Sequence, residues 1–312
     1  MRNSVGAPAL LGPAEFVRSS EALEYTYTAD EARAYTRWLA THHYENFHVV
    51  SFLLPKWLHQ DFYNVYAYCR WADDLGDEIG DRAESLRLLA WWRSELDAMY
   101  SGRAAHPVFV ALRGTVERYA IPREPFSNLI DAFVQDQTVT RYRNWDQLFG
   151  YCRNSANPVG RLILYLCGYS DAARQRLSDA TCTALQLANF WQDIIVDLEK
   201  DRVYLPLDVI GRNGYSVEEL FARRYSSAFC AIMREAVAKA RELFLEGLPL
   251  SRMVDRRLAL DLDLFSRGGM RILQKIEEQD YDVLHTRPVV SKLDRVWLLL
   301  RSLARVALLR AA

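Results

Sequence analysis

Apolar residues recur along most of this chain at spacings of three and four, the period of an amphipathic α-helix, and few segments alternate with a period of two. The fold class predicted is therefore all-α, with residues 1–27 as an irregular N-terminal extension and residues 28–312 as one helical domain. Capping boxes at Thr28–Glu31 and Ser216–Glu219 mark helix starts, and Pro55 ends or kinks the first helix. The further predicted helices cover residues 61–78, 84–101, 107–120, 125–141, 146–169 with a break at 157–160, 178–199, 217–247, 250–280 and 291–310.

Two of the predicted helices carry a polar stripe along one side. The stripe positions are three or four residues apart, so each set lies on one helical face. Apolar residues such as Trp71 and Trp191 flank the stripes, and a polar stripe within an apolar helix is costly to bury unless it binds something. The stripes consist of Tyr66, Arg70, Asp73 and Asp77 in the first helix, and of Gln186, Asn189, Asp193 and Asp197 in the second.

Each stripe ends in two aspartates four residues apart. At that spacing the Cβ atoms are about 5–6 Å apart and like charges repel each other. For one such pair alone, a solvated helix face is the simpler interpretation. Two pairs in apolar helices favour hard divalent cations instead, since Mg2+ takes carboxylate oxygens together with water and substrate phosphates. If the two pairs faced each other, they would hold a diphosphate through bridging metal ions.

Length, charge and cysteine content indicate the class of protein in which this chemistry would occur. The chain has 312 residues, half of them hydrophobic, and a net charge of −1, which gives no general attraction to nucleic acid. Its five cysteines are scattered and include no C-x-x-C pair, which favours reduced thiols in a cytoplasmic protein. We find neither a membrane-spanning stretch nor a secretory signal.

The two polar stripes belong to longer sequence segments that resemble a known protein family. From about Thr36 to Arg295 the chain is similar to the squalene/phytoene synthase family of head-to-head prenyl transferases. The resemblance implies a single helical bundle of the isoprenoid synthase type around a central cavity, and Mg2+-dependent ionisation of prenyl diphosphates. The segments that carry it are YAYCRWADDLGDE (66–78), YCRNSANPVGR (151–161), LQLANFWQD (185–193) and RVYLP (202–206).

The resemblance also assigns roles to single residues. Two or three Mg2+ ions would be bound by the two aspartate motifs, and Arg70 would contact the diphosphate. Tyr151 would transfer a proton or stabilise a cation. The expected metal ligands are Asp73, Asp77, Asn189, Asp193 and Asp197; the expected substrate-binding residues are Phe47, Tyr66, Gln186 and the basic Arg287, Lys292 and Arg295 near the C-terminus, for which an ordinary surface position is the alternative.

Departures from the common family pattern bear on the reaction. Many relatives place Lys and Arg where this chain has Glu45 and Gln192, so a site for two diphosphates has fewer cations here. Together with Asn157-Pro158, these residues look most like the hydroxysqualene synthase branch of bacterial hopanoid pathways. That branch converts presqualene diphosphate and water to hydroxysqualene and diphosphate. The alternatives are head-to-head condensation of two farnesyl diphosphates, phytoene synthesis, and a non-catalytic assembly factor.

A carbocation would need a dry pocket with electron-rich walls. Phe47, Phe52, Tyr66, Tyr151 and Phe190 are candidates, with plain core packing as the alternative for Phe52 and Phe190. Water capture would need a polar group in that wall, and Tyr151, Asn154 or Asn157 is available; Asn157 is equally consistent with a turn before Pro158.

Few other partners or cofactors are indicated. No dinucleotide motif is present, and NADPH is not expected. Trp297–Leu300 lie among Arg295, Arg301, Arg305 and Arg310, which predicts either a core helix or a basic amphipathic helix in weak contact with the inner face of the cell membrane. Partners would be the prenyl diphosphate and, in a hopanoid pathway, its other enzymes.

Overall fold

The computed structural model describes residues 8–42, 55–291, 294, 298–299 and 301–302. Over these residues the protein is all-α, which confirms the predicted fold class, and they contain no β-strand beyond one isolated bridge between Arg141 and Val203. The chain forms two compact units, residues 1–138 with 162–169 and residues 139–161 with 170–312. The single domain predicted over residues 28–312 stays a prediction.

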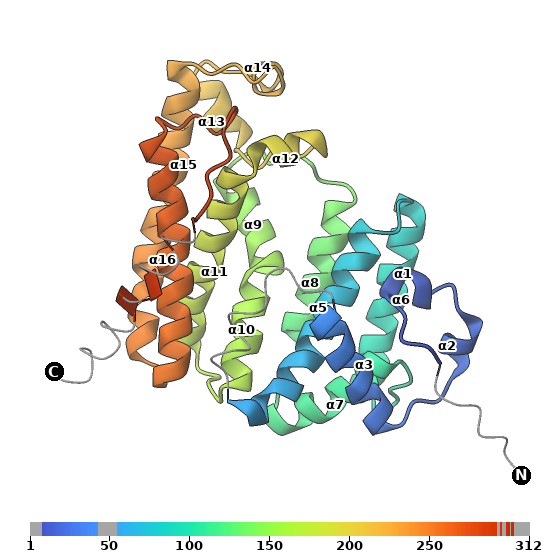
Figure 1. The fold of residues 1–312 in the computed structure, drawn as a ribbon. Coiled ribbons are helices and arrows are strands. Elements are labelled where there is room, and N and C mark those ends of the chain that lie inside the picture. The colour runs from blue at the N-terminus through green and yellow to red at the C-terminus, as the bar shows by residue number, and fades with distance from the viewer. Residues whose placement is uncertain (1–7, 43–54, 292–293, 295–297, 300, 303–312) are drawn as a thin grey trace, which may run out of the picture. The chain divides into compact units, whose positions relative to one another are not determined.

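The first unit is built around one buried helix, α5. Helix α5 packs against α3, α6, α7 and α8, and it buries large residues such as Tyr68 and Trp71. In Figure 1 these helices run from blue to green. The elements of this unit are α1 (Pro13–Phe16), α2 (Ser20–Glu24), α3 (Ala29–His42), the 3-10 helix η1 (Lys56–Leu58), α5 (His59–Asp77), α6 (Arg82–Tyr100), α7 (Pro107–Tyr119) and α8 (Arg123–Asp136).

The sequence analysis predicted an irregular extension over residues 1–27, but part of this segment is helical. The segments 13–16 and 20–24 are helical, and Phe16 is 1% exposed because its ring packs on Tyr35, Trp71 and His106. The expectation was wrong there because short helices held by tertiary packing leave little periodicity in the sequence.

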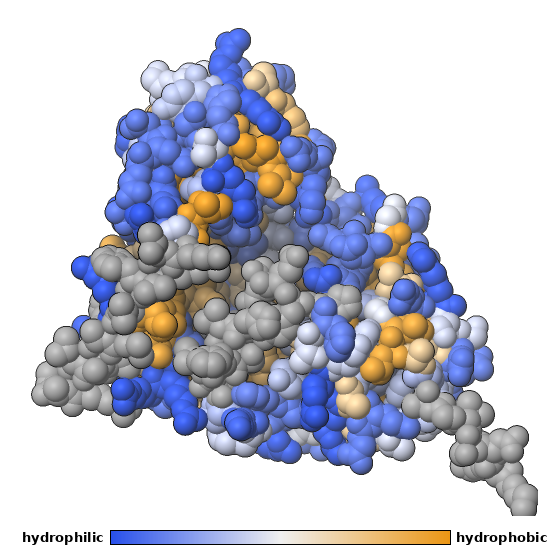
Figure 2. All heavy atoms as spheres, in the orientation of Figure 1, coloured by the Kyte–Doolittle hydropathy of each residue, from blue (hydrophilic) through white to orange (hydrophobic). Residues whose placement is uncertain are grey.

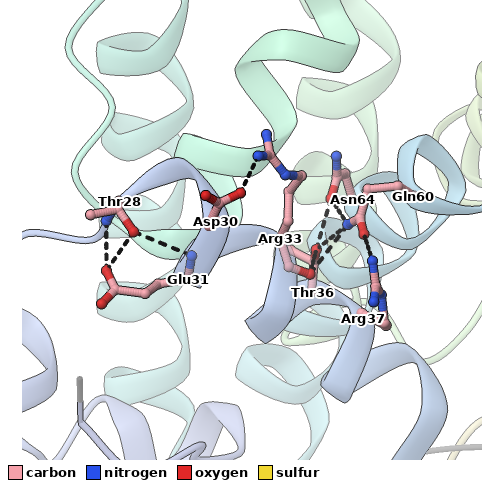
Figure 3. Close-up of polar contacts among 8 residues, drawn as sticks. All are labelled: Thr28, Asp30, Glu31, Arg33, Thr36, Arg37, Gln60 and Asn64. Carbon is pink, nitrogen blue, oxygen red and sulfur yellow. Dashed lines mark hydrogen bonds and ion pairs between the residues drawn. The ribbon is translucent and has the colours of Figure 1, made fainter. Parts of the chain in front are cut away.

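The start of α3 follows the capping box read from the sequence (Figure 3). The Thr28 hydroxyl accepts a hydrogen bond from the Glu31 N–H (3.3 Å), and the Glu31 carboxylate accepts one from the Thr28 N–H (2.8 Å). One turn further, the Thr36 hydroxyl donates to Asn64 Oδ1 (2.7 Å). The Asn64 amide in turn donates to the Ala111 carbonyl (3.1 Å). This buried network ties α3 and α7 to α5.

The second unit is organised by α11 and α15, which pack along each other, with α16 against both. The Trp191 ring N–H donates to the Ala236 carbonyl (3.1 Å), which fixes the end of α11 on α15. These helices run from yellow-green to red-orange in Figure 1. The elements are α9 (Trp145–Ser155), α11 (Ala172–Gln192), α12 (Ile194–Glu199), α13 (Leu207–Arg212), α14 (Val217–Phe221), α15 (Ser227–Gly247), the 3-10 helix η2 (Leu248–Arg252) and α16 (Arg256–Glu278); α10 (Asn157–Leu166) is divided between the two units.

Several predicted boundaries were wrong. The helix predicted over 125–141 ends at Asp136, and those predicted over 217–247 and 250–280 are each broken near the start. The segment 222–226 separates α14 from α15, where the Ser226 hydroxyl caps α15. The largest error lies in the helix predicted over 178–199, which begins at Ala172 and is interrupted at Asp193.

On the face drawn in Figure 2, hydrophobic residues form separate orange patches. Large hydrophobic side chains that are exposed include Trp57, which is 67% exposed, and Leu245, which is 56% exposed. Among the helices formed by the described residues, none has the length and apolar character needed to span a membrane.

Candidate active site

The first aspartate motif occupies the last two turns of α5. Asp73 is half-buried, while Asp77 is the exposed last residue of the helix. The Gln137 side chain donates to the Gly76 carbonyl (2.9 Å) and so fixes the helix end between the two carboxylates. Tyr66, two turns earlier, is 9% exposed. The stripe read from the sequence therefore lies on one continuous helix.

Arg70 forms ion pairs within this motif. Its guanidinium lies 2.5 Å from Asp74 Oδ1 and 3.4 Å from Asp73 Oδ2. Asp74 is 4% exposed, so a buried carboxylate holds the arginine in place. The sequence analysis gave Asp74 no role, although its position four residues after Arg70 is a detectable signal for such a pair.

Electrostatics in the first motif favour a bound cation. Burial raises the pKa of Asp73 to about 6, and the carboxylates of Asp77 and Asp74 add to the rise while Arg70 opposes it. Burial also raises the pKa of Asp74. These carboxylates carry more negative charge than Arg70 alone balances, a situation that a divalent cation relieves.

The second aspartate motif crosses a break between two helices. Asp193 ends α11 with φ −107° and ψ 16°, outside helical values, and α12 follows at once. The Asp193 N–H still donates to the Asn189 carbonyl, and the Asp197 N–H to the Asp193 carbonyl, both at 2.9 Å. The helical spacing of the motif is thus kept across the break. The β-branched run at 194–196 explains why the helix is weak here.

Asp197 lies in an environment that opposes its negative charge. Burial and, to a smaller extent, the Asp193 carboxylate raise the pKa of Asp197 to about 7, against the opposing effect of Arg202 and Lys200. Of the other predicted residues in this motif, Gln186 is half-buried and Asn189 is exposed.

Four aromatic rings form a cluster beside the second motif. Phe190 and Tyr204 stack with centroids 3.6 Å apart, and Tyr151 lies 6.3 Å from Phe190 and 6.1 Å from Tyr204. Tyr142 completes the cluster at 5.5 Å from Tyr151. Tyr151 and Phe190 were predicted wall residues; Tyr142 and Tyr204 were missed, although Tyr204 lies within the RVYLP segment. A small cavity of about 10 Å³, room for roughly one water, lies beside this cluster and is lined by Phe190, Asp197, Arg202 and Tyr204 among others.

The segment 151–161 is fixed to α11 by three contacts. Asn157 Oδ1 accepts a hydrogen bond from the Thr183 hydroxyl (2.9 Å), and Arg161 pairs with Asp179 at 2.7 Å. A Cβ atom at Gly160 would approach Ser178 Oγ to 2.4 Å, so only glycine permits this close packing. Asn157 is buried as the first residue of α10 and does not lie in an exposed turn.

Arg287 contacts the second motif directly. Its guanidinium donates to Asp193 Oδ1, and next to it the Gln192 amide donates to the Pro288 carbonyl (2.6 Å). Of the other residues predicted at the substrate, Phe47, Lys292 and Arg295 lie outside the described residues, as does Glu45.

The carboxylates of the two motifs suit Mg2+ if water and substrate phosphates complete its coordination shell. Within the described residues, no three His, Cys, Asp or Glu side chains come close enough to form a metal site by themselves. Each motif instead offers a pair of carboxylates, of which Asp73 is paired with Arg70 and Asp193 with Arg287. Mg2+ commonly binds through one or two carboxylates and completes its shell with waters and substrate phosphates, so this arrangement suits it.

The comparisons with known proteins agree with the fold and the motifs. Residues 40–294 match the model of the squalene/phytoene synthase family. The chain is 34% identical to a phytoene synthase of Thermus thermophilus over 82% of its own length and 87% of that protein. It is also 34% identical to a hydroxysqualene synthase of Rhodopseudomonas palustris over 80% of its length and 86% of that protein.

Among solved structures, the chain is similar to the squalene synthase HpnC of Alicyclobacillus acidocaldarius. The TM-score is 0.78 with 43% sequence identity, covering 81% of this chain and 95% of that one. The protein therefore belongs to the squalene/phytoene synthase family, whose members are prenyl-transferase-like enzymes of isoprenoid biosynthesis.

Proposed function

We propose that this protein converts presqualene diphosphate and water to hydroxysqualene and diphosphate. The observation that carries the proposal concerns Gln192. This residue stands where many family members have arginine, and its side-chain amide donates a hydrogen bond to the Pro288 carbonyl. The second motif therefore offers one cation fewer for a second diphosphate. Similarity to two hydroxysqualene synthases, at 34% and 33% identity, supports the same choice.

Leaving-group departure needs the charge of the diphosphate to be neutralised. Mg2+ held by Asp73, Asp77, Asn189, Asp193 and Asp197 would supply Lewis-acid stabilisation of that charge. Arg70, held by Asp74, offers a preorganised guanidinium for the diphosphate oxygens. Tyr66 and Gln186 lie on the same helix faces as these groups and would orient the substrate.

The C–O bond to diphosphate breaks with both electrons leaving on oxygen, which leaves a carbocation. The cluster of Tyr142, Tyr151, Phe190 and Tyr204 presents π-faces that stabilise positive charge by about 0.5–2 kcal/mol per ring. Water then adds to the cation and loses a proton, which would end on the released diphosphate; the proposed role of the Tyr151 hydroxyl is to relay it, accepting one proton while it gives up its own. Asn157 would help to hold that water through its amide group.

A second candidate is head-to-head condensation of two prenyl diphosphates. Two specific observations favour it: the 34% identity to a phytoene synthase and the 43% identity to a squalene synthase. This reaction would produce presqualene diphosphate, squalene or phytoene from linear precursors.

One experiment separates the two. Purified protein is incubated with Mg2+ and presqualene, farnesyl or geranylgeranyl diphosphate in separate reactions, with and without NADPH, and the lipid products are identified. We expect hydroxysqualene from presqualene diphosphate with Mg2+ alone, no effect of NADPH, and little turnover of farnesyl diphosphate. Efficient formation of presqualene diphosphate, or of phytoene from geranylgeranyl diphosphate, would support the condensation instead.

We also propose weak contact with anionic membranes through the basic C-terminal segment, because substrate and product are strongly apolar. Arg295, Trp297 and Arg305 of this segment lie outside the described residues. Co-sedimentation should show salt-sensitive binding to anionic liposomes and none to neutral ones. Equal binding to both would remove this proposal.

A further inference from the structure

The chain after α16 forms an extended segment, residues 282–291, which we call the C-terminal strap. Its base is fixed to the second unit: Val283 and Leu284 are fully buried, and the Gln279 amide donates to the carbonyls of Asp282 and Thr286, both at 2.9 Å. Figure 1 shows the strap as the red trace that leaves the end of α16. The segment between its anchors has no regular secondary structure.

The far end of the strap is anchored on α16 again. Asp294 accepts hydrogen bonds from the Ser291 N–H (2.8 Å) and hydroxyl (2.7 Å). The same carboxylate pairs with Arg271 at 2.9 Å and Lys275 at 3.1 Å. With both ends fixed, the middle of the strap can move only over a short range.

The middle is held by two neighbouring residues of the second aspartate motif. Gln192 donates to the Pro288 carbonyl (2.6 Å), and Asp193 accepts from the Arg287 guanidinium. Pro288 is buried, whereas the Arg287 side chain is 49% exposed and that of Asp193 is 18% exposed. Two contacts at consecutive positions fix which strap residue faces Asp193.

This ion pair and a metal ion compete for one carboxylate. Arg287 donates to Asp193 Oδ1, and a guanidinium at that oxygen would repel a divalent cation bound to it. A metal ion bound by Asp193 therefore displaces Arg287, and a diphosphate bound to that metal ion offers the guanidinium a new anionic partner.

We propose that Gln192 is a positioning residue that latches the strap, so that Arg287 occupies Asp193 until a divalent cation and diphosphate arrive together. Arg287 then passes from Asp193 to the diphosphate. The inference rests on the proposed function in one respect, namely that Asp193 binds the metal ion. It gives a physical reason for glutamine at position 192: an arginine there would place a second cation beside Arg287 and repel it from Asp193.

The test uses the full-length protein, Gln192→Met, which removes the donor at similar size, and Gln192→Asn, whose shorter amide does not reach Pro288. Gln274→Ala is the matched control, because it removes an exposed amide on α16 that donates to Glu278. Two measurements are made: hydrogen exchange of the backbone amides in residues 286–290, and Mn2+ binding by electron paramagnetic resonance with and without pyrophosphate. Circular dichroism verifies folding of each variant.

We expect exchange in residues 286–290 to rise at least tenfold in both Gln192 variants without ligands, and Mn2+ alone to bind two- to tenfold more tightly, while the control behaves as wild type. Mn2+ with pyrophosphate should bring exchange in this segment to the same level in wild type and variants. Unchanged exchange in the Gln192 variants would overturn the latch. Faster exchange without any change in Mn2+ binding would overturn the competition at Asp193. If the wild-type protein does not bind Mn2+ even with pyrophosphate, both the competition at Asp193 and the proposed function are contradicted. The hydrogen-exchange measurement tests the contact between Gln192 and the strap whether or not Mn2+ binds.

Discussion

Phe190 and Tyr204 stack with their ring centroids 3.6 Å apart and their planes 7° from parallel. Phe190 belongs to α11, and Tyr204 to the loop after α12, so the stack joins the chain before the second aspartate motif to the chain after it. Both rings are buried. The stack thereby fixes the aromatic cluster beside the carboxylates of this motif.

Replacing Tyr204 should therefore slow ionisation. In Tyr204→Leu the loss of one π-face worth about 0.5–2 kcal/mol lowers kcat by roughly 2- to 30-fold, whereas Tyr204→Phe keeps the ring and stays within about twofold of wild type. Steady-state kinetics on presqualene diphosphate, alongside thermal unfolding, provide the measurement. Equal loss in both variants would assign the effect to the hydroxyl group instead of the ring.

Removing one carboxylate from either motif should abolish turnover and preserve the fold. Asp73→Ala and Asp193→Ala each delete a proposed metal ligand, and we expect kcat to fall by about 10³-fold or more, because the leaving-group charge is no longer neutralised. Neither side chain is fully buried, so no large core cavity opens. Product assays with circular dichroism test this, and near-normal activity in folded Asp193→Ala would contradict it.

The sequence predicted the fold where local chemistry sets the boundary. The capping boxes at Thr28 and Ser216 are present, and the helix predicted over 61–78 spans His59–Asp77. The helix predicted over 178–199 failed at Asp193, because apolar periodicity continues through the break. The β-branched run at 194–196 weakens the helix locally, but Gln192 and Asp193 also contact Pro288 and Arg287, about a hundred residues away in sequence, and no local pattern contains these contacts.

The same distinction holds for the candidate site. The spacing of Asp73 and Asp77 on one helix was predictable, because helix geometry alone sets it. The ion pair of Arg287 with Asp193 was not, since it forms between distant segments. The role of Tyr204 also required the structure, as its stacking on Phe190 depends on the course of the loop after α12.

Asn64 should matter for stability and little for catalysis. Its side chain accepts from Thr36 and donates to the Ala111 carbonyl and to Thr115 Oγ1 (3.0 Å), all in buried surroundings. Asn64→Ala leaves these groups without their partner, which costs about 2–4 kcal/mol in the free energy of unfolding. Urea denaturation measures the loss, and kcat of the folded fraction should remain within twofold. A change in the free energy of unfolding below about 0.5 kcal/mol would show that water replaces the amide.

His106 should make the first unit sensitive to acid. Its ring lies 4.4 Å from that of Trp71 and 5.0 Å from that of Trp92, and its Nδ1 accepts a hydrogen bond from the Val108 N–H (3.3 Å) at the start of α7. Burial lowers the pKa of His106 well below its usual value. The folded protein thus holds this imidazole neutral at pH values where the unfolded chain protonates it.

Because the unfolded state binds the extra proton, stability is present above a pH of about 6.5 and falls as the pH drops below it, by up to about 1.4 kcal/mol per pH unit. His106→Asn keeps a capping side chain that does not titrate. The free energy of unfolding of this variant should be lower than that of wild type at pH 7 but should decrease less as the pH falls. Urea denaturation of both proteins between pH 7 and pH 5 compares the two slopes. Identical slopes would mean that His106 does not remain neutral in the folded protein.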